Sequence, residues 1–409
     1  MRIQSIEVKN FKSLDDFRLD LAKFTCLIGL NGSGKSTVLQ FIDFLSQLVR
    51  GDMEAWLEER HWKRSDLRSK LIPRKKNIEF CVRFVNEHDE PAGRWEATYS
   101  PFDNRCTSER IDLLDFLLET KRDEINIVNL LPKSRSKFKD RSIPLAFSYE
   151  GSVLSALKTE LLPPSIMRCK ELIGAIKSLE LLSPAFLRQR TRESSGSLGL
   201  GGQRLASFLH EIGSSKRQEL VRHLKKVYPQ LMGLTAKSLR GGWKQIEISE
   251  QYEGSRIMGI DLGHLFKPGV AIVKRMTTEA RHINDGMLRL MAILAELETE
   301  NRFLLFDEIE NGINPELVEF VVDKLTQARQ QVMVTTHSPM ILNYLDDDTA
   351  RAGVMYLYKT PRGATKSIPF FSIPSLAEKL TVMGPGEAFV DTNLTQLAEE
   401  IASMTPEEA

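Results

Sequence analysis

The chain has 409 residues, of which 42% are hydrophobic, and a formal net charge of +1 at pH 7. This length allows two or three domains with a sizeable core, and the balanced charge excludes a polycation, so nucleic acid would be contacted through local patches. The four cysteines form no Cys-x-x-Cys pair, which favours reduced thiols over a disulfide framework or a zinc site. The sequence has no apolar signal core at its start and no run of eighteen apolar residues, so we expect a cytoplasmic protein without a membrane span.

The predicted elements alternate between strands and helices. Alternating apolar residues at 2–8 predict a strand, and residues 27–45 predict a strand, a glycine-rich turn and a helix. Further strands are expected at 17–29, 77–85, 94–100, 243–254, 269–276, 302–308 and 330–338, helices at 152–182, 204–232, 285–298 and 392–404, and a loop at 192–202. No internal repeat or sustained heptad occurs, so no long coiled-coil arm is predicted.

Residues 29–36, GLNGSGKS, fit the phosphate-loop pattern G-x-x-x-x-G-K-[ST] completely, between an apolar strand and an apolar helix. Glycines let the backbone curl so that successive N–H groups meet phosphate oxygens, and the helix adds its positive N-terminal end. The lysine is expected to neutralise the β- and γ-phosphates, and the serine hydroxyl to ligate Mg²⁺. The predicted ATP-binding residues are Asn31, Gly32, Ser33, Gly34, Lys35, Ser36 and Thr37.

Two carboxylates, Asp307 and Glu308, close the apolar run FLLFDE. Such a pair at the end of a buried strand is costly unless a cation lies there. In a Walker B arrangement Asp307 holds Mg²⁺ through its water shell, and Glu308 acts as general base or positions the attacking water. An ordinary acidic strand end is the alternative, but the phosphate loop in the same chain favours the Walker B interpretation.

A histidine, His337, ends the next apolar strand, VMVTT, 29 residues after Glu308. A parallel sheet would bring both strand ends to one crevice, where such folds bind ligands. We therefore expect the His337 imidazole to sense the γ-phosphate, with a purely structural histidine as the alternative.

The motifs together resemble the ATP-binding-cassette (ABC) superfamily, in which a signature opens a helix shortly before Walker B. Two stretches compete for that role. Asn284, Asp285 and Gly286 lie about twenty residues before Asp307 and precede an amphipathic helix, whereas LGGQ at 200–203 lies about a hundred residues upstream in a Ser/Gly-rich loop. We interpret the first stretch as the signature and the second as a decoy, either a flexible loop or a support near nucleotide or partner.

The physical reason for a signature is that a helix N-terminus beside a glycine offers N–H groups to an anion. The resemblance implies that this anion is the γ-phosphate held by another subunit, so that ATP joins a homodimer or a higher oligomer. The family's usual serine is Asn284 here, an amide with a different reach. A simple helix cap is the alternative.

A closer resemblance rests on three segments: the opening IQSIEVKNFKSLDDFRLDLAKFTCLIGLNGSGKST, IENGINPELVEFVVDKL after Walker B, and SPMILNYL after the histidine. They resemble the stand-alone ATPases grouped with OLD-family, RecF-like and SMC-like heads, over roughly residues 1–50 and 280–350. The resemblance implies an α/β fold: a bilobal ABC-ATPase head with a phosphate-loop sheet lobe and a mixed, partly helical second lobe. Many such bacterial ATPases serve anti-phage defence with a separately encoded nuclease, as in Septu-type and TOPRIM-partnered systems.

OLD-type enzymes carry a TOPRIM nuclease after the ATPase, whereas about seventy residues follow His337 here. Within them, Asp346, Asp347 and Asp348 resemble a metal site, but no strand with a partnering glutamate precedes them, so we interpret the run as a solvated turn. We therefore expect no nuclease chemistry in this chain and a separate effector partner.

Three basic patches are candidate contacts for DNA or RNA. Solvated surface or an acidic protein partner is the alternative interpretation. The patches are Lys133, Arg135, Lys137, Lys139 and Arg141; Arg60, Lys63, Arg64, Arg68, Lys70, Arg74, Lys75 and Lys76; and Arg188, Arg190 and Arg192.

The expected domains are a nucleotide lobe from 1–60 and 280–370, an inserted second lobe at 61–279, and a C-terminal tail at 371–409. The expected function is the ATP- and Mg²⁺-dependent sensor and scaffold subunit of an anti-phage complex that controls a partner nuclease. A RecF/SMC-like DNA-repair ATPase and a self-sufficient OLD-like nuclease are the alternatives.

Overall fold

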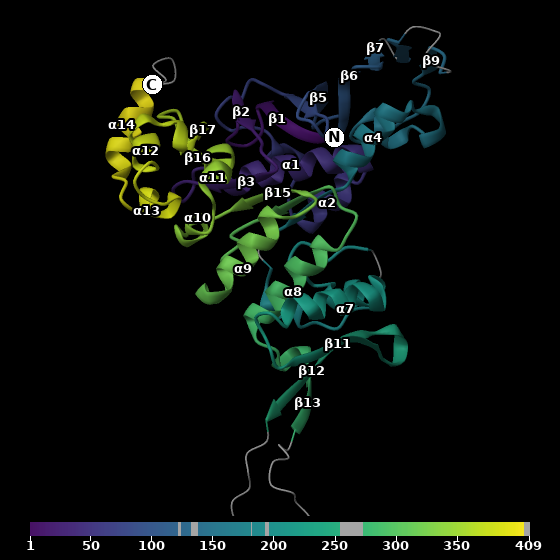
Figure 1. Cartoon of the computed structure of the whole chain (residues 1–409). Coiled ribbons are helices and arrows are strands. Elements are labelled where there is room, and N and C mark those ends of the chain that lie inside the picture. Colours follow the sequence, from purple (N-terminus) through teal and green to yellow (C-terminus); the bar gives the residue numbers. More distant parts are fainter. Residues whose placement is uncertain (122–123, 132–137, 181, 193–195, 254–272, 405–409) are drawn as a thin grey trace, which may run out of the picture. The chain divides into compact units, whose positions relative to one another are not determined.

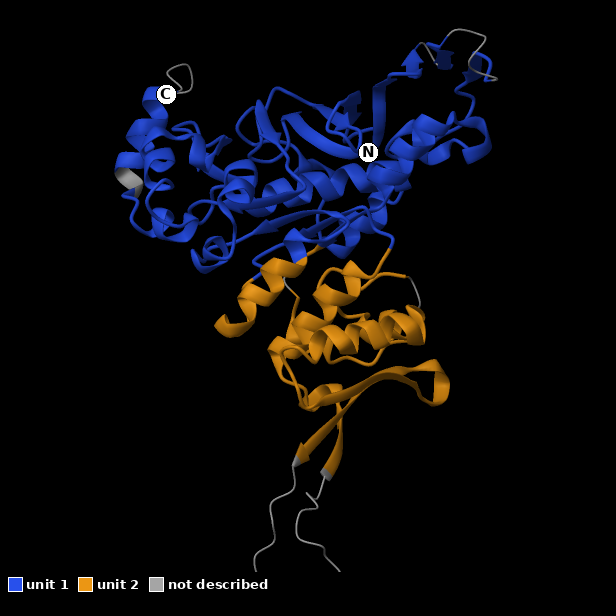
Figure 2. Cartoon of the chain, in the orientation of Figure 1, with its two compact units in different colours: residues 1–178, 300–309, 325–409 blue, residues 179–299, 310–324 orange. Residues whose placement is uncertain are grey.

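The fold is described from a computed structural model, which describes residues 1–121, 124–131, 138–180, 182–192, 196–253 and 273–404. The chain divides into two compact units (Figures 1 and 2). Unit 1 contains residues 1–178, 300–309 and 325–409, and unit 2 contains residues 179–299 and 310–324.

The larger sheet of unit 1 has eight strands, each antiparallel to its neighbours, in the order β2-β1-β4-β5-β6-β7-β8-β9. Short connections between successive strands from β4 onward are typical of an antiparallel meander. The strands are β1 (Arg2–Lys9), β2 (Phe17–Asp20), β4 (Ile78–Val85), β5 (Pro91–Ser100), β6 (Arg105–Leu113), β7 (Phe116–Lys121), β8 (Glu124–Asn129) and β9 (Arg141–Pro144).

The second sheet of unit 1 has six strands in the order β10-β14-β15-β3-β16-β17. Strands β14, β15, β3 and β16 run parallel, and β17 closes the edge antiparallel to β16. β14, β15 and β3 are buried along their whole length, as expected for parallel strands. The strands are β10 (Ile176–Leu179), β14 (Phe303–Phe306), β15 (Gln331–Thr335), β3 (Phe24–Ile28), β16 (Val354–Lys359) and β17 (Thr365–Pro369).

Helix α1 (Lys35–Arg50) lies between the two sheets (Figure 1) and is buried on almost every side, which explains its near-continuous apolar sequence. On one side Phe41 and Phe44 contact Phe80 and Tyr99 of the eight-stranded sheet, with ring centroids 6.2 and 5.1 Å apart. The same core includes residues of β3, β14, β15 and β16. One hydrophobic core therefore joins both sheets through the helix that follows the phosphate loop.

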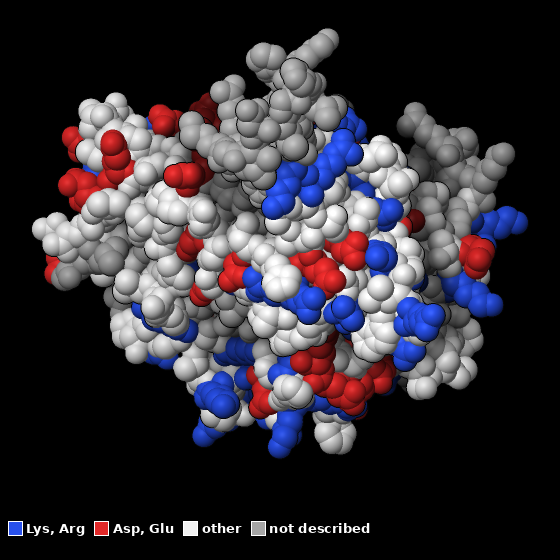
Figure 3. All heavy atoms as spheres, turned by 90° about the horizontal axis from the view of Figure 1, so that it is seen from below, with Lys and Arg blue, Asp and Glu red and all other residues white. Residues whose placement is uncertain are grey.

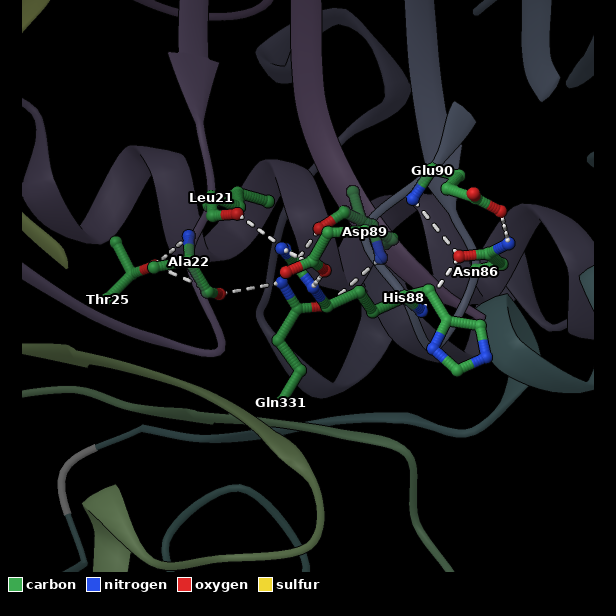
Figure 4. Close-up of polar contacts among 10 residues, drawn as sticks. Leu21, Ala22, Thr25, Asn86, His88, Asp89, Glu90 and Gln331 are labelled. Atoms are coloured by element: carbon green, nitrogen blue, oxygen red, sulfur yellow. Dashed lines mark hydrogen bonds and ion pairs between the residues drawn. The ribbon is translucent and has the colours of Figure 1, made fainter. Parts of the chain in front are cut away.

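A glutamine, Gln331, adds a polar connection between the sheets (Figure 4). Its Oε1 accepts a hydrogen bond from Ile3 N (3.1 Å), and its Nε2 donates to Ile3 O (2.8 Å) and Ala22 O (3.0 Å). Because Gln331 is only 4% exposed, water cannot replace these bonds. Nearby, Arg2 donates to Leu21 O (2.8 Å) and pairs with Asp89.

The remaining helices of unit 1 are short. Asp43 of α1 accepts hydrogen bonds from Trp56 Nε1 (2.6 Å) and Arg60 (2.7 Å), which anchors the segment after α2. The helices are α2 (Met53–Glu59), α3 (Val153–Ala156), α4 (Pro164–Gly174), α10 (Met340–Asn343), α11 (Asp347–Gly353), α12 (Pro374–Lys379), α13 (Pro385–Val390) and α14 (Leu394–Met404).

Unit 2 contains a three-stranded antiparallel sheet, in the order β11-β12-β13, and a group of helices. Alternate residues such as Leu234, Ile246 and Ile248 are buried on one face of the sheet, and α6 and α7 contact its strands. Its elements are α5 (Pro184–Leu187), α6 (Leu205–Glu211), α7 (Gly213–Leu224), β11 (Leu231–Ser238), β12 (Lys244–Glu253), β13 (Val273–Glu279), α8 (Asp285–Leu297) and the first residues of α9 (Pro315–Thr326).

The division by internal contacts differs from the domain boundaries drawn from the sequence. Residues 61–178 were assigned to an inserted lobe, but they lie in unit 1, because β4 to β9 extend the sheet that β1 and β2 begin. Residues 280–299 lie in unit 2, where α8 contacts α5 and α7. The 371–409 tail groups with unit 1, in which Phe389 contacts Phe370 at 5.6 Å between centroids.

Within the described residues, no helix is long and apolar enough to cross a membrane.

We predict that Gln331→Leu lowers the free energy of unfolding by roughly 2–4 kcal/mol, because two buried and one partly buried backbone groups lose their partner while the side-chain volume is retained. Urea unfolding followed by tryptophan fluorescence measures this. The matched control is Gln4→Leu at an exposed position of β1, which should change stability by less than about 0.5 kcal/mol. Equal effects of the two variants would contradict the assigned role of Gln331.

Candidate nucleotide site

Three parallel strands of the six-stranded sheet bring their carboxyl ends to one edge. β15 pairs with β14 on one side and β3 on the other. β3 leads into residues 29–36, β14 into Asp307 and Glu308, and β15 into Thr336 and His337. The sheet therefore brings together the three segments that sequence analysis singled out within unit 1.

The phosphate loop has the backbone that its glycines predict. Gly29, Gly32 and Gly34 all have positive φ angles, of 145°, 77° and 111°. A Cβ atom at Gly29 would lie 2.3 Å from Leu357 O, and one at Gly34 would lie 2.4 Å from Thr365 Oγ1. Glycine is therefore required at both positions by conformation and by space.

The start of α1 holds the loop lysine. Lys35 is the first residue of α1, and its Nζ donates to Gly29 O (2.8 Å) and Leu30 O (3.3 Å). Ser36 is exposed at the same helix start. Ser33 is 3% exposed, and its hydroxyl makes no hydrogen bond among the described residues.

Asp307 and Glu308 are held by a threonine that the sequence analysis did not identify. The Thr335 hydroxyl donates to Asp307 Oδ1 (2.5 Å) and accepts from Glu308 N (2.8 Å). Glu308 has a φ of 48°, which is an uncommon, left-handed conformation for a non-glycine residue. Thr335 is fully buried, so its hydroxyl fixes the turn that carries both carboxylates.

His337 lies between the lysine and the glutamate. Its Nδ1 is 3.4 Å from Lys35 Nζ, and its Nε2 is 3.8 Å from Glu308 Oε1. The His337 and Glu308 side chains are 39% and 35% exposed, so both are accessible to a ligand. Lys35, His337 and Glu308 thus form a continuous line of functional groups contributed by three separate segments.

The residues at this edge fit a magnesium nucleotide. The curled loop, the helix N-terminus and Lys35 match the needs of phosphate oxygens. The Ser36 hydroxyl and the Asp307 carboxylate are oxygen ligands of the kind that Mg²⁺ prefers, together with phosphate oxygens and water.

The proposed signature residues lie in unit 2. Asn284 is the N-cap of α8, and its side-chain oxygen accepts a hydrogen bond from Met287 N (2.8 Å), which fits the helix-cap alternative as well. A Cβ atom at Gly286 would meet nothing closer than Gly312 O at 3.4 Å. A Cβ atom at 286 therefore makes only ordinary van der Waals contacts within the chain.

Two arginines hold the start of α8. Arg188 donates to Ile283 O (2.8 Å) and forms an ion pair with Asp285. Arg289 donates to Asn311 O (2.5 Å) in the segment after Walker B. Neither contact has a local sequence signal, and Arg188 was assigned only to a basic patch.

The LGGQ stretch has a structural explanation. Residues 200–203 form a turn before α6, in which Gly202 has a φ of 85°. A Cβ atom would lie 2.6 Å from the Phe186 ring at Gly201, and 2.4 Å from a Leu187 methyl group at Gly202. The positive φ of Gly202 favours glycine there, and the short distances show that this turn packs closely on α5.

The three basic patches differ in how many of their side chains are paired with other residues and how many are exposed. In the third patch Arg188 pairs with Asp285, Arg190 with Glu279 (3.9 Å), and Arg192 stacks on Trp243. In the long patch Lys63, Lys70, Arg74, Lys75 and Lys76 are exposed. Lys133, Arg135 and Lys137 lie outside the described residues, whereas Lys139 and Arg141 lie within them. The face in Figure 3 carries basic and acidic side chains side by side.

The three consecutive aspartates begin a helix. Asp346 is the N-cap of α11 and accepts from Thr349 N (2.7 Å), and this bond lowers its pKa below the ordinary value. Asp347 and Asp348 lie in the first helical turn and are exposed. Carboxylates at a helix N-terminus are stabilised by the helix dipole, so the run begins a helix rather than the solvated turn that was predicted. Among the described residues, no group of three or more His, Cys, Asp or Glu side chains is arranged to hold a metal ion.

Comparisons with known proteins give two family matches. The family described as "AAA ATPase domain" matches residues 1–161, and the family described as "AAA domain, putative AbiEii toxin, Type IV TA system" matches residues 275–343. The two matched regions carry the phosphate loop and the segment from the proposed signature to His337.

Two curated proteins share shorter regions. An OLD nuclease of Thermus scotoductus is 32% identical over 117 residues, which is 27% of this chain and 19% of that protein. The DNA repair protein RecN of a Synechocystis species is 36% identical over 72 residues, which is 17% of this chain and 12% of that protein. The match therefore spans less than a fifth of the length of either relative.

Two solved structures share the fold. A structure described as an Smc head bound to the C-terminal winged-helix domain of ScpA matches with a TM-score of 0.52 and 18% identity, over 90% of this chain and 97% of that chain. The Smc head domain of Pyrococcus furiosus with an extended coiled coil, bound to the C-terminal domain of ScpA, matches with a TM-score of 0.50 and 14% identity, over 93% and 99%. The α/β ATPase-head fold expected from the sequence is confirmed by these matches.

AAA-type ATPase domains are therefore matched over residues 1–161 and 275–343, and the fold resembles that of the Smc heads.

Proposed function

We propose that the chain binds MgATP at the edge of the six-stranded sheet and hydrolyses it there. The observation that carries this proposal is the line formed by Lys35, His337 and Glu308, with gaps of 3.4 and 3.8 Å between their functional atoms. A phosphate bound by the loop would replace the two loop carbonyls as partners of Lys35.

Each residue at this edge has a separate role in the proposed reaction. Ser36 and Asp307 hold Mg²⁺, which neutralises the charge that develops on the phosphates. Glu308 accepts a proton from the attacking water or orients that water. His337 contacts the γ-phosphate, and Thr335 keeps both carboxylates in place by its two hydrogen bonds.

The same proposal includes ATP-dependent association of two chains. The N-terminus of α8, with Asn284, Asp285 and Gly286, would meet the γ-phosphate bound by another copy. Because the Asn284 oxygen caps the helix, its amide nitrogen is the group that would donate to the anion. In this arrangement ATP joins the two subunits and is also the substrate that is hydrolysed.

We also propose that the ATPase controls a separately encoded effector, such as a nuclease, in anti-phage defence. The resemblance to OLD-type proteins and the family description that names a toxin of a type IV system support this proposal. Exposed lysines of the long basic patch are the candidate contacts with DNA or RNA.

A second candidate function is DNA repair. The likeness to RecN favours it, and an OLD-like nuclease within the chain is a third candidate favoured by the other curated relative.

Two substitutions test the nucleotide site. Lys35→Ala should abolish tight MgATP binding, because the phosphates lose their main counter-charge. Glu308→Gln should retain binding but slow hydrolysis by roughly a hundredfold or more, because it removes the base while leaving the Mg²⁺ ligands. Fluorescent-nucleotide titration and single-turnover hydrolysis measure the two effects. Hydrolysis at the normal rate by Glu308→Gln would show that another group activates the water.

Gly286→Arg tests the signature. The variant should block turnover and ATP-dependent dimer formation while leaving nucleotide binding by one chain nearly intact, because a Cβ atom at 286 clashes with nothing in the chain. Light scattering with ATP, in a Glu308→Gln background, measures dimer formation.

The matched control for the signature test is Gly384→Arg, since a Cβ atom there meets nothing within 4 Å and its φ of −67° suits any residue. Gly202 is unsuitable as a comparison because its φ of 85° makes any side chain there strained. Gln203→Ala tests the decoy instead, and a larger loss of turnover in Gln203→Ala than in Gly286→Arg would make LGGQ the signature.

A plasmid assay separates the candidate functions. The purified chain should leave plasmid DNA intact with Mg²⁺ or Mn²⁺, with or without ATP, and nucleotide-dependent cleavage should appear when the product of a neighbouring gene is added. Cleavage by the pure chain that survives Asp307→Ala would reveal a second active site and overturn the partner-dependent proposal.

A further inference from the structure

A threonine on the edge strand, Thr365, contacts the phosphate loop. It is the first residue of β17 and is fully buried. Its hydroxyl donates to Ser33 O at 2.8 Å. The neighbouring Gly34 can approach so closely only because it lacks a Cβ atom, which would lie 2.4 Å from Thr365 Oγ1.

The hydrogen bonds of the Thr365 hydroxyl are saturated. A hydroxyl has one proton to donate and two lone pairs that accept. The proton goes to Ser33 O, and one lone pair accepts from Lys359 Nζ at 2.9 Å. The remaining contact, with Ser13 Oγ at 2.9 Å, therefore requires Ser13 to be the donor. The Thr365 hydroxyl is thus fixed in direction by two donors.

The backbone around Thr365 is fixed as well. Thr365 N donates to Ser13 O at 2.8 Å, and Thr365 pairs with Lys359 across the β16–β17 hairpin. β16 pairs in turn with β3, the strand that leads into the phosphate loop. The loop is therefore attached to the sheet at its start by β3 and near its end by a side chain of β17.

The orientation of one peptide group follows from this contact. A peptide is planar and trans, so the Ser33 carbonyl and the Gly34 N–H belong to one rigid unit and point in opposite directions. When Ser33 O is held toward Thr365, Gly34 N–H is directed away from β17. That N–H is one of the backbone donors with which a phosphate loop binds phosphate oxygens.

We propose that Thr365 is a positioning residue for nucleotide binding: its hydroxyl sets the Ser33–Gly34 peptide so that the Gly34 N–H is presented to phosphate. The inference rests on the proposed binding of MgATP by this loop. It assigns a role in the site to β17, a strand that none of the sequence motifs includes.

The test compares Thr365→Val, which keeps the shape and removes the hydroxyl, with Thr365→Ser, which keeps the hydroxyl. Affinities for MgATP and MgADP are measured at a temperature well below unfolding of each variant, so that a loss of stability alone does not change them. Thr365→Val should bind both nucleotides roughly tenfold or more weakly, the loss of about one well-placed hydrogen bond, and Thr365→Ser should bind within about threefold of the unmodified chain.

Two further variants complete the comparison. Thr360→Val lies in the same hairpin, and its hydroxyl accepts only a local bond from Ala364 N at 3.2 Å, so its affinity should equal that of the unmodified chain. Ser13→Ala removes one of the donors that orient the Thr365 hydroxyl and should weaken binding several-fold. If Thr365→Val does not fold, Ser13→Ala replaces it as the test of the proposal.

The outcomes distinguish this inference from the proposed function. If the unmodified chain does not bind nucleotide, both are overturned. Suppose instead that the unmodified chain binds nucleotide and Lys35→Ala does not. If Thr365→Val then binds as tightly as the unmodified chain, only the role of Thr365 is overturned. If Thr365→Val does not fold, the same result with Ser13→Ala overturns that role. Weak binding by Thr365→Val with recovery in Thr365→Ser supports the proposal.

Discussion

The parallel pairing of β15 with both β14 and β3 is the interaction on which the candidate site depends. Parallel strands end at the same edge, so the pairing alone brings together segments separated by about three hundred residues. A shift of one residue between β14 and β15 would turn side chains to the opposite face and separate Thr335 from Asp307. The buried apolar residues of the three strands hold the register, and Gln331 fixes one end of β15 against Ile3. The same strand register is therefore required for the stability of the core and for the geometry of the site.

The two sheets of unit 1 share their core through α1, the helix that follows the phosphate loop. The loop is bounded by a buried strand and a helix that is buried on nearly all sides. Packing on both faces of α1 fixes the direction of its N-terminus, while Lys35 and Thr365 fix the loop by hydrogen bonds from within and from the neighbouring hairpin. Several weak constraints from distant parts of the chain thus determine the position of a few backbone N–H groups.

Much of the fold was predictable from local patterns. The phosphate loop, the acidic strand end and the strand before His337 each carry a short signal, and most of the predicted strands and helices correspond to observed ones. The 269–276 prediction was tested only from residue 273 onward, because the preceding residues lie outside those described. Strands β6, β7 and β8 were not among the predicted elements, and four charged residues among the nine of β6 obscure its alternation.

The features that escaped prediction are contacts between residues distant in sequence. Thr335 and Thr365 are ordinary strand threonines until pairing places them beside Asp307 and Ser33. Arg188 is one of three alternating arginines, and only the fold reveals its partner Asp285. The domain boundary at residue 61 differed for the same reason, since nothing local shows that β4 pairs with β1. The roles of the predicted site residues remain proposals that the stated experiments test.

The left-handed backbone at Glu308 links function to evolutionary change. A non-glycine residue in this conformation is disfavoured by roughly 1–2 kcal/mol, and glycine or asparagine would adopt it more easily. Selection for thermal stability alone would therefore favour loss of this carboxylate, as happens where functional residues occupy strained positions. If Glu308 activates water, it is retained because selection for ATP hydrolysis outweighs selection for stability at this position. Relatives that have lost hydrolysis but kept nucleotide binding would then be expected to carry glycine or asparagine at the same turn.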